Sequence, residues 1–328
     1  MERRGLRPGL SAREGRARPR GLAAARIERL IDGVKWSCAS RPRAPLAFGD
    51  RFHRFRVIRT IGVGGMGVVY EAWDDITARC VALKLVAGGS RDHLRASLRL
   101  LREARALTRV SHPGVVDLVS VGAFAGHVYL AMEYVPGETL ASWVRRPATG
   151  HGAIVEMFLR AGDALAAVHG AGLVHRDFKP SNVIIGAGAV RLVDFGLAVP
   201  ARAWGDRDPL AGLDARARVG TPMYMSPEQC AGRPASPRSD QFAFCVALSQ
   251  ALQGAHPFAG DTATEDAAHI EDGGGCVDTA ELPHALRAVL RRGLALAERD
   301  RWSSMATLLE RLAEARRVLH RARRAQHR

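Results

Sequence analysis

Two short stretches of this chain hold most of its lysine. Lys84 interrupts the apolar run CVALKLV, Lys179 lies in HRDFKPSN, and Lys35 is the only other lysine. The chain has 48 Lys and Arg residues together, so arginine supplies almost all of its positive charge. Lysine offers a compact point charge, whereas the planar guanidinium of arginine has a different reach and geometry. A lysine inside an apolar, strand-like run therefore indicates a role that arginine cannot fill.

A glycine-rich stretch precedes this apolar run. IGVGGMGVVYEA contains Gly62, Gly64 and Gly67 in the spacing GxGxxG. The same spacing opens dinucleotide-binding sites, but there the loop runs into a helix. Here the strand formers Val-Val-Tyr follow, which favours the tip of a hairpin that folds over phosphates, with glycines that allow close backbone approach. Taken alone, the stretch leaves an ordinary glycine-rich hairpin as an open alternative.

The elements that must position these stretches fall into two parts. Between residues 55 and 135, short apolar and β-branched runs alternate with glycine turns, and one charged amphipathic segment, LRASLRLLREARALTRV, has helical spacing. From Pro136 onward the long apolar runs have helical spacing. This order predicts an α+β plan in two lobes, at residues 55–135 and 136–312.

The net charge of +15 lies in the two ends of the chain. Residues 1–56 hold 15 basic and 5 acidic side chains, residues 311–328 hold 7 and 1, and the remaining 254 residues hold 26 and 27. A near-neutral domain speaks against nucleic-acid binding. We expect residues 1–54 to be a mostly disordered basic arm, with weak helical periodicity only around residues 23–31. Residues 313–328 should form a basic helical tail, either a solvated helix end or a contact for an acidic partner or surface.

The cysteines and the apolar runs exclude several classes of protein. The five cysteines are far apart and form no CxxC pair, which argues against a zinc site or a disulfide framework and favours a reducing, cytoplasmic setting. The stretch MERRGLRPGLSAREGRARPR has no apolar run behind its charges, so it does not resemble a secretory signal. The longest uncharged run, residues 241–260, contains Gln, His and Pro, so we expect its first half, QFAFCVALSQAL, to be a buried helix and not part of a transmembrane segment.

Five motifs in order carry a resemblance to a known family: GVGGMGVV, VALK, HRDFKPSN, DFG and SPE. Over residues 55–312 the chain resembles the eukaryotic-like (Hanks-type) bacterial serine/threonine protein kinases. The resemblance implies a small antiparallel-sheet lobe with one helix and a larger, mainly helical lobe. It also implies transfer of the γ-phosphate of ATP to Ser or Thr hydroxyls of protein substrates, with Mg²⁺ as the metal.

The resemblance assigns the catalytic roles to matching positions. Lys84 would bind the α- and β-phosphates and pair with Glu103. Asp177 would accept the proton of the substrate hydroxyl, and Lys179 would neutralise charge on the transferred phosphoryl group. Thr221, in GTPMYMSPE, would hydrogen-bond Asp177 and shape the acceptor site.

The resemblance also assigns the metal and nucleotide sites. Oxygens of Asn182 and Asp194 would bind Mg²⁺, a hard cation. Val69 and Ala82 would cover the adenine from one side and Ile184 from the other. The backbone of Glu133 and Val135 would hydrogen-bond its edge, with Met132 at the back of the pocket. The complete nucleotide-binding set is Ile61, Gly62, Gly64, Gly65, Gly67, Val69, Ala82, Lys84, Met132, Glu133, Val135 and Ile184.

Structural and regulatory roles follow from the same resemblance. Glu228 would pair with Arg301 as a buried strut, and Asp240 would cap or brace the buried helix behind the catalytic loop. Kinases with an arginine before the catalytic aspartate, as Arg176 is here, commonly need a phosphate on the activation segment.

The activation segment departs from this pattern. The sequence LAVPARAWGDRDPLAGLDARARVG, between Gly196 and Thr221, contains no Ser, Thr or Tyr. We therefore expect Asp206, Asp208 or Asp214 to pair with Arg176, or activity to be set by a partner or by the tails.

Two functions remain open on sequence alone, an active kinase and a kinase-like scaffold that no longer transfers phosphate. Every residue expected to carry the chemistry is present, which favours the active enzyme. The substrate, the activating signal and the oligomeric state do not follow from the sequence.

Overall fold

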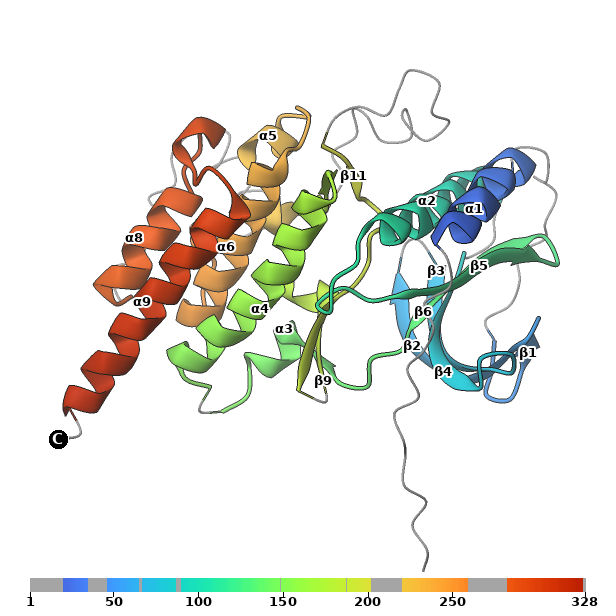
Figure 1. Cartoon of the computed structure of the whole chain (residues 1–328), viewed down its shortest axis with the longest axis horizontal. Helices are drawn as coiled ribbons and strands as arrows, with labels where there is room; N and C mark the ends of the chain where they lie inside the picture. The colour runs from blue at the N-terminus through green and yellow to red at the C-terminus, as the bar shows by residue number, and fades with distance from the viewer. Residues whose placement is uncertain are drawn as a thin grey trace, which may run out of the picture.

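The structure is a computed structural model that describes residues 20–34, 46–64, 67–86, 90–147, 149–186, 188–201, 220–258 and 282–326. These residues form two lobes that lie side by side, one built on a sheet and the other mainly helical (Figure 1). The predicted two-lobed α+β fold is confirmed.

An antiparallel sheet forms the first lobe, and among the described residues it has six strands in the order β1-β2-β3-β4-β6-β5. The pairing of β2 with β3 runs as far as Gly64 opposite Gly67, so the glycine-rich stretch is the tip of a hairpin, as predicted. Phe55 packs edge-on against Tyr129 in the core of this lobe, with 5.2 Å between the ring centroids. The strands are β1 (Arg51–Phe52), β2 (Phe55–Gly64), β3 (Gly67–Asp74), β4 (Arg79–Leu85), β5 (Leu118–Phe124) and β6 (His127–Glu133).

The charged amphipathic segment forms α2 (Ser90–Arg109), which contacts β5 and β6. This helix is buried on every side over two turns. Seven of the eight residues from Leu100 to Leu107 are buried, and the eighth, Arg105, is half-buried. A helix buried all round needs a second covering element besides the sheet.

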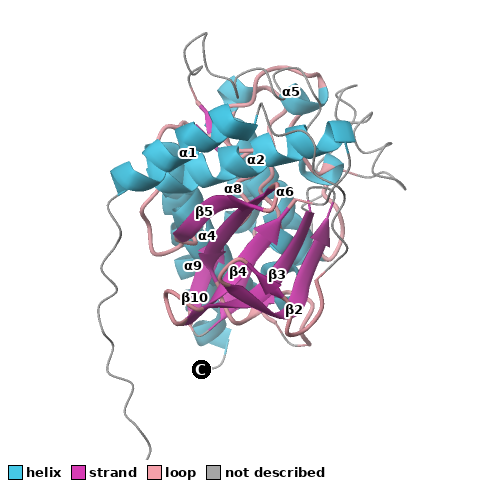
Figure 2. Ribbon diagram, turned by 90° about the vertical axis from the view of Figure 1, so that its right-hand side faces the viewer, coloured by secondary structure: helices cyan, strands magenta, loops and turns pink. Residues whose placement is uncertain are grey.

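That covering element is a helix at residues 20–34, where the structure differs from the expected disordered arm. α1 (Arg20–Val34) lies beside α2 in both views (Figures 1 and 2). Ile27 and Ile31 are 0% and 1% exposed, and their spacing of four residues puts them on one helix face. β1 also precedes the expected start of the lobe at residue 55. Residues 1–19 and 35–45 lie outside the described residues.

The second lobe packs long helices around a shared apolar core. Phe158 and Phe244 meet edge-on there, with 5.5 Å between their centroids. Short strands of this lobe pair in two small sheets, in the orders β10-β9-β7 and β11-β8. Their bounds are β7 (Glu138–Thr139), β8 (Leu173–Val174), β9 (Val183–Gly186), β10 (Ala189–Leu192) and β11 (Val199–Pro200). Among the described residues, the helices of this lobe are α3 (Leu140–Trp143), α4 (His151–Gly170), α5 (Pro227–Cys230), α6 (Pro237–Gln253), α8 (His284–Gly293) and α9 (Met305–Gln326), with single 3₁₀ turns at Pro180–Asn182, Pro222–Tyr224 and Glu298–Asp300.

The uncharged run begins in α6, which is buried at the centre of the second lobe. The side chains of Ser236 and Ser239 form a capping box at its start, and Gly254 ends it with a φ of 77°. Residues 242–248 are at most 5% exposed, so the predicted buried helix is confirmed. None of the helices that the structure describes combines the length and the apolar character needed to cross a bilayer. At the chain end, α9 continues as a helix through Gln326.

Candidate active site

Lys84 lies where β4, α2 and the segment between β10 and β11 meet. Its Nζ donates to Oε2 of Glu103 at 2.8 Å and to Oδ1 of Asp194 at 2.9 Å. The predicted contact with Glu103 is confirmed, whereas the contact with Asp194 is one that the sequence reasoning missed. Only 9% of the Lys84 side chain is exposed, so these carboxylates are its main polar surroundings.

One ammonium group is therefore shared between two carboxylates. Burial lowers the pKa of Lys84, but the charges of Glu103 and Asp194 outweigh it, so the pKa lies above its ordinary value. Burial raises the pKa of Glu103 by more than the charge of Lys84 lowers it. Burial also raises the pKa of Asp194, yet the nearby Lys84 leaves it below its ordinary value. Lys84 and Asp194 are thus both charged at neutral pH.

Asp177 lies at the centre of a second polar cluster in the loop after β8. Its Oδ1 accepts hydrogen bonds from the backbone N–H and the hydroxyl of Thr221, each at 2.8 Å. Its Oδ2 lies 2.9 Å from Nζ of Lys179, which also donates to the Thr221 hydroxyl at 2.6 Å. Asn182 donates to the Asp177 carbonyl at 2.9 Å. The predicted contact between Thr221 and Asp177 is confirmed, and three residues, Lys179, Asn182 and Thr221, hold Asp177 in place.

The loop that carries Asp177 is held by Asp240 of α6. Arg176 has a φ of 69°, in the left-handed region that costs a non-glycine residue about 1–2 kcal/mol. The two oxygens of Asp240 accept from the backbone N–H groups of His175 and Arg176, each at 2.7 Å, and His169 lies 2.8 Å away. Burial raises the pKa of Asp240, but the hydrogen bond to His169 and the neighbouring groups lower it below its ordinary value. Asp240 therefore braces the loop that carries Asp177 and not its own helix, which is capped by Ser236 and Ser239, so the predicted role of capping or bracing the helix is corrected.

Replacing Asp240 with asparagine should lower the free energy of unfolding at pH 7 by about 2 to 3 kcal/mol. An amide cannot accept from both backbone N–H groups. The folded-state pKa of Asp240 is depressed, so its stabilisation is present above the unfolded-state pKa and is lost as pH falls through the folded-state pKa. Urea unfolding at pH 7 and at pH values below 4 should therefore show a difference that shrinks in acid, whereas a pH-independent difference would contradict this account. Asp163→Asn, at a 69% exposed side chain, is the matched control.

A contact between the rings of Phe195 and His175 lies next to both polar clusters. Phe195 is fully buried, and its ring packs edge-on against His175 with 5.0 Å between the centroids. Asp194, the preceding residue, has a φ of 62°. Phe195 thus packs against the loop that carries Asp177, while the adjacent Asp194 accepts from Lys84. The sequence reasoning did not single out these rings, although both belong to the quoted motifs HRDFKPSN and DFG.

The glycines of the β2–β3 hairpin differ in whether the fold itself requires a glycine at the position. A Cβ at Gly67 would lie 2.0 Å from the Leu85 carbonyl oxygen, and the φ of Gly67 is 142°, so only glycine fits. A Cβ at Gly62 would make only ordinary contacts with Val69, and one at Gly64 would meet nothing within 4 Å. Packing within the described residues therefore does not explain Gly62 and Gly64. Gly65 lies outside the described residues.

The residues predicted to bind adenine lie on strands of the sheet, just after β6 and on β9. Val69, Ala82, Val135 and Ile184 are half-buried, whereas their neighbours Val81, Leu83 and Val183 are fully buried. Met132 is 7% exposed, and Ile61 is 38% exposed. The Glu133 N–H already donates to the Asp117 carbonyl at 2.9 Å, so a ligand at this residue would use its carbonyl oxygen.

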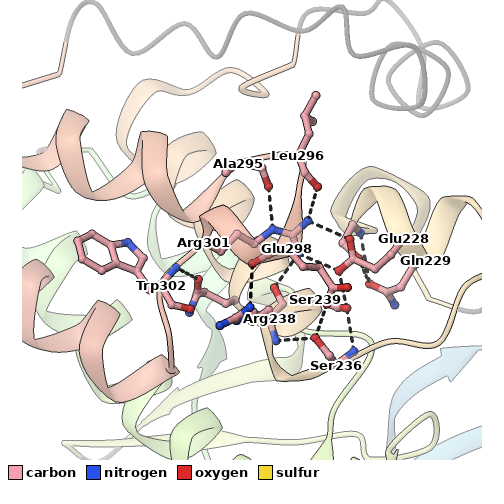
Figure 3. A network of polar contacts seen from close by, with 12 residues as sticks. Glu228, Gln229, Ser236, Arg238, Ser239, Ala295, Leu296, Glu298, Arg301 and Trp302 are labelled. Carbon is pink, nitrogen blue, oxygen red and sulfur yellow. Dashed lines mark hydrogen bonds and ion pairs between the residues drawn. The ribbon is translucent and has the colours of Figure 1, made fainter.

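Glu228 and Arg301 form the predicted buried pair in the helical lobe (Figure 3). Two guanidinium nitrogens lie 2.8 and 2.9 Å from the two carboxylate oxygens, and Ser239 donates to Glu228 at 2.6 Å. Arg301 also donates to three backbone carbonyls, those of Arg238, Ala295 and Leu296. Burial raises the pKa of Glu228, but Arg301 brings it below its ordinary value. This network ties α5, α6 and the segment before α9 together.

The predicted acidic partners of Arg176 cannot be placed. Asp206, Asp208 and Asp214 lie outside the described residues, as does the whole segment from residue 202 to residue 219.

The family assignment rests on a match over most of the chain. Residues 55–313 match the model of the protein kinase domain. The chain belongs to the protein kinase family. In this kinase the contact between Lys84 and Asp194 joins the sheet lobe to the helical lobe, and the cluster around Asp177 belongs to the helical lobe.

Curated relatives of this kinase come from several bacteria. Serine/threonine-protein kinase PknD of Chlamydia pneumoniae is 32% identical over 286 residues, which cover 78% of this chain and 30% of the relative. Serine/threonine-protein kinase PknE of Mycobacterium bovis is 36% identical over 264 residues, covering 79% and 46%. Serine/threonine-protein kinase pkn2 of Myxococcus xanthus is 37% identical over 218 residues, covering 63% and 25%. The chain thus spans less than half the length of each of these relatives.

Proposed function

We propose that this protein is an ATP-dependent serine/threonine kinase that transfers the γ-phosphate of ATP to Ser or Thr hydroxyls of protein substrates. The observation that carries the proposal is the presence of two polar clusters built from the residues of the motifs. One is Lys84 with Glu103 and Asp194, and the other is Asp177 with Lys179 and Thr221. Similarity to bacterial proteins named serine/threonine-protein kinases supports the same conclusion.

In this mechanism Asp177 orients the acceptor hydroxyl and receives its proton as the new oxygen–phosphorus bond forms. The hydrogen bonds from Thr221 and Asn182 fix the direction of the carboxylate. Lys179 lies within 3 Å of both Asp177 and Thr221, so its charge is available to the phosphoryl group in transfer. Catalysis of this kind consists mostly of positioning and charge compensation.

Lys84 would hold the α- and β-phosphates while Glu103 keeps its ammonium group in place. The hairpin tip at Gly62 and Gly64 would cover the phosphates, because backbone without side chains allows close approach. The half-buried apolar side chains Val69, Ala82 and Ile184 would enclose the adenine ring, and the backbone of Glu133 and Val135 would hydrogen-bond its edge, with the Glu133 carbonyl as one acceptor.

The donor atoms fit a magnesium ion that is bound together with phosphates. The amide nitrogen of Asn182 is engaged with Asp177, which leaves its carbonyl oxygen for a hard cation. Asp194 offers Oδ2, because its Oδ1 accepts from Lys84. The described residues contain no group of three or more His, Cys, Asp or Glu that could hold a metal alone. Mg²⁺ suits such a site, since it is usually bound by few carboxylates together with phosphates and waters.

Replacing both Gly62 and Gly64 with alanine should raise KM for ATP by about tenfold, because the added methyl groups keep the backbone of the hairpin tip away from the phosphates and weaken binding. The free energy of unfolding should stay close to that of the parent, since the added methyl groups meet ordinary contacts or open space. Steady-state kinetics and urea unfolding measure the two quantities.

Gly67→Ala is the contrasting variant and should lower stability, because its Cβ would collide with backbone. An unchanged KM in the double variant would mean that the stretch is an ordinary hairpin.

Mass spectrometry after incubation of the full chain with ATP, Mg²⁺ and a generic basic protein tests the proposed function. We expect phosphate on Ser and Thr residues and none on Tyr, with Asp177→Asn as the control. No transfer under several metal conditions would instead favour the kinase-like scaffold.

We also propose a cellular compartment and a class of partner for this protein. Cys80, Cys230 and Cys245 are free thiols, which supports a reducing, cytoplasmic setting. The basic residues at the two ends of the chain are candidate contacts for an acidic partner.

A further inference from the structure

α1 covers the helix that carries a catalytic-site residue. α2 supplies Glu103, whose Oε2 binds Lys84, and α1 contacts both α2 and β5. Figure 2 shows α1 and α2 lying alongside each other next to the sheet. Ile27 and Ile31 belong to the same buried cluster as Leu101 of α2. The N-terminal helix is therefore part of the packing that surrounds Glu103.

Opposite sides of α2 are fixed by different partners. Glu103 and Arg105 lie two residues apart, so their side chains project about 200° apart around the helix. Glu103 contacts Lys84 on the site side, while Arg105 lies 2.7 Å from Glu28 of α1 on the far side. Any rotation or outward shift of α2 would thus disturb the contacts with α1 as well as the ion pair with Lys84.

The stretch between Gly196 and Thr221 offers no hydroxyl group whose phosphorylation could hold the active site in place. Residues 197–220 contain no Ser, Thr or Tyr, so no phosphate can be placed there on a hydroxyl. The contact of Lys84 with Glu103 nonetheless exists in the unmodified chain.

We propose that α1 is a built-in positioning element, in which Ile27 and Ile31 anchor α2 so that Glu103 stays paired with Lys84. This inference rests on the proposed kinase function. Ile27, Ile31 and Glu28 are positioning residues, because they act on the site only through α2. The α1 anchor supplies within one chain the alignment that a phosphorylated activation segment would otherwise favour.

The test compares the full-length parent with Ile27→Ala/Ile31→Ala. Alanine favours helix, so the substitutions remove the anchor without removing the helical tendency of α1. We expect backbone amides of residues 100–107 to exchange hydrogen about tenfold faster, while amides of α6 keep the parental rate. We expect kcat to fall by about tenfold, because a smaller fraction of molecules holds the Lys84–Glu103 pair, with a smaller change in KM for ATP.

Glu28→Ala provides a milder variant in case the double variant folds poorly. It removes the half-exposed Glu28 carboxylate that contacts Arg105. Exchange in α2 should become faster and kcat lower, each by less than in the double variant. Arg29→Ala is the matched control, since Arg29 is exposed and lies two residues from Ile27, on another face of α1. It should behave as the parent in both measurements.

Either of two results would overturn the inference. One is parental exchange in α2 of the double variant. The other is faster exchange with unchanged kcat in molecules that remain folded, which would reduce α1 to a packing role. If the parent transfers no phosphate, the proposed function fails, and the exchange comparison alone still decides whether α1 anchors α2.

Discussion

Asp177→Asn is expected to lower kcat by about 10² to 10⁴-fold while the protein stays folded and still binds ATP. The amide keeps the size of the carboxylate and can still accept from Thr221, so the loop should retain its shape. It cannot receive the proton of the acceptor hydroxyl, and it no longer balances the charge of Lys179 at 2.9 Å. Single-turnover kinetics with saturating ATP measure the effect on the chemical step.

Asp163→Asn is the matched control for this prediction, because it makes the same chemical change at a 69% exposed side chain of α4. Its kcat should equal that of the parent. Near-parental kcat in Asp177→Asn would mean that Asp177 does not take part in proton transfer, and the assignment of the catalytic loop would be wrong.

Lys84→Arg is expected to remove most phosphoryl transfer, by about 10² to 10³-fold in kcat/KM, although the positive charge is kept. The Nζ of Lys84 fits between two carboxylates at 2.8 and 2.9 Å in a site where only 9% of the side chain is exposed. A planar guanidinium is larger and longer, so it would displace Glu103 or Asp194 from the geometry that the phosphates need. Kinetics at several ATP concentrations separate weaker binding from slower transfer.

Lys35→Arg makes the same change at the one lysine outside the site motifs and serves as the control. Its activity should match that of the parent. Normal activity in Lys84→Arg would show that a generic positive charge is enough at this position, which the choice of lysine in an arginine-rich chain argues against.

The sequence predicted the hairpin tip from a local signal, and it predicted three contacts between residues far apart in the chain through the resemblance of whole motifs. The hairpin tip follows from glycines flanked by strand formers, and the Lys84–Glu103, Asp177–Thr221 and Glu228–Arg301 contacts follow from motif resemblance. The structure adds the geometry that motifs do not contain. Asp240 lies 64 residues beyond Arg176 in the chain, so its two bonds to the catalytic loop exist only once α6 is packed behind that loop.

α1 shows why the remaining part of the fold was not predictable. Its apolar positions, such as Ile27 and Ile31, lie in a segment rich in Arg and Ala whose periodicity is weak. An isolated helix of 15 residues is marginal in water, so its stability comes from a tertiary partner. That partner is α2, and burial of the α2 residues in turn depends on α1. The sequence of either helix alone therefore does not show that α1 and α2 pack together.

Single-turnover transfer by phosphatase-treated full-length protein tests the central claim most directly. The protein is mixed with ATP, Mg²⁺ and a Ser-containing acceptor, and phosphate on the acceptor and on the protein is followed by mass spectrometry. The account predicts transfer from the first turnover, without a lag, and with Thr221 unmodified, because the Lys84 and Asp177 clusters are already assembled. Absence of transfer, or transfer only after phosphate appears on Thr221, would contradict it.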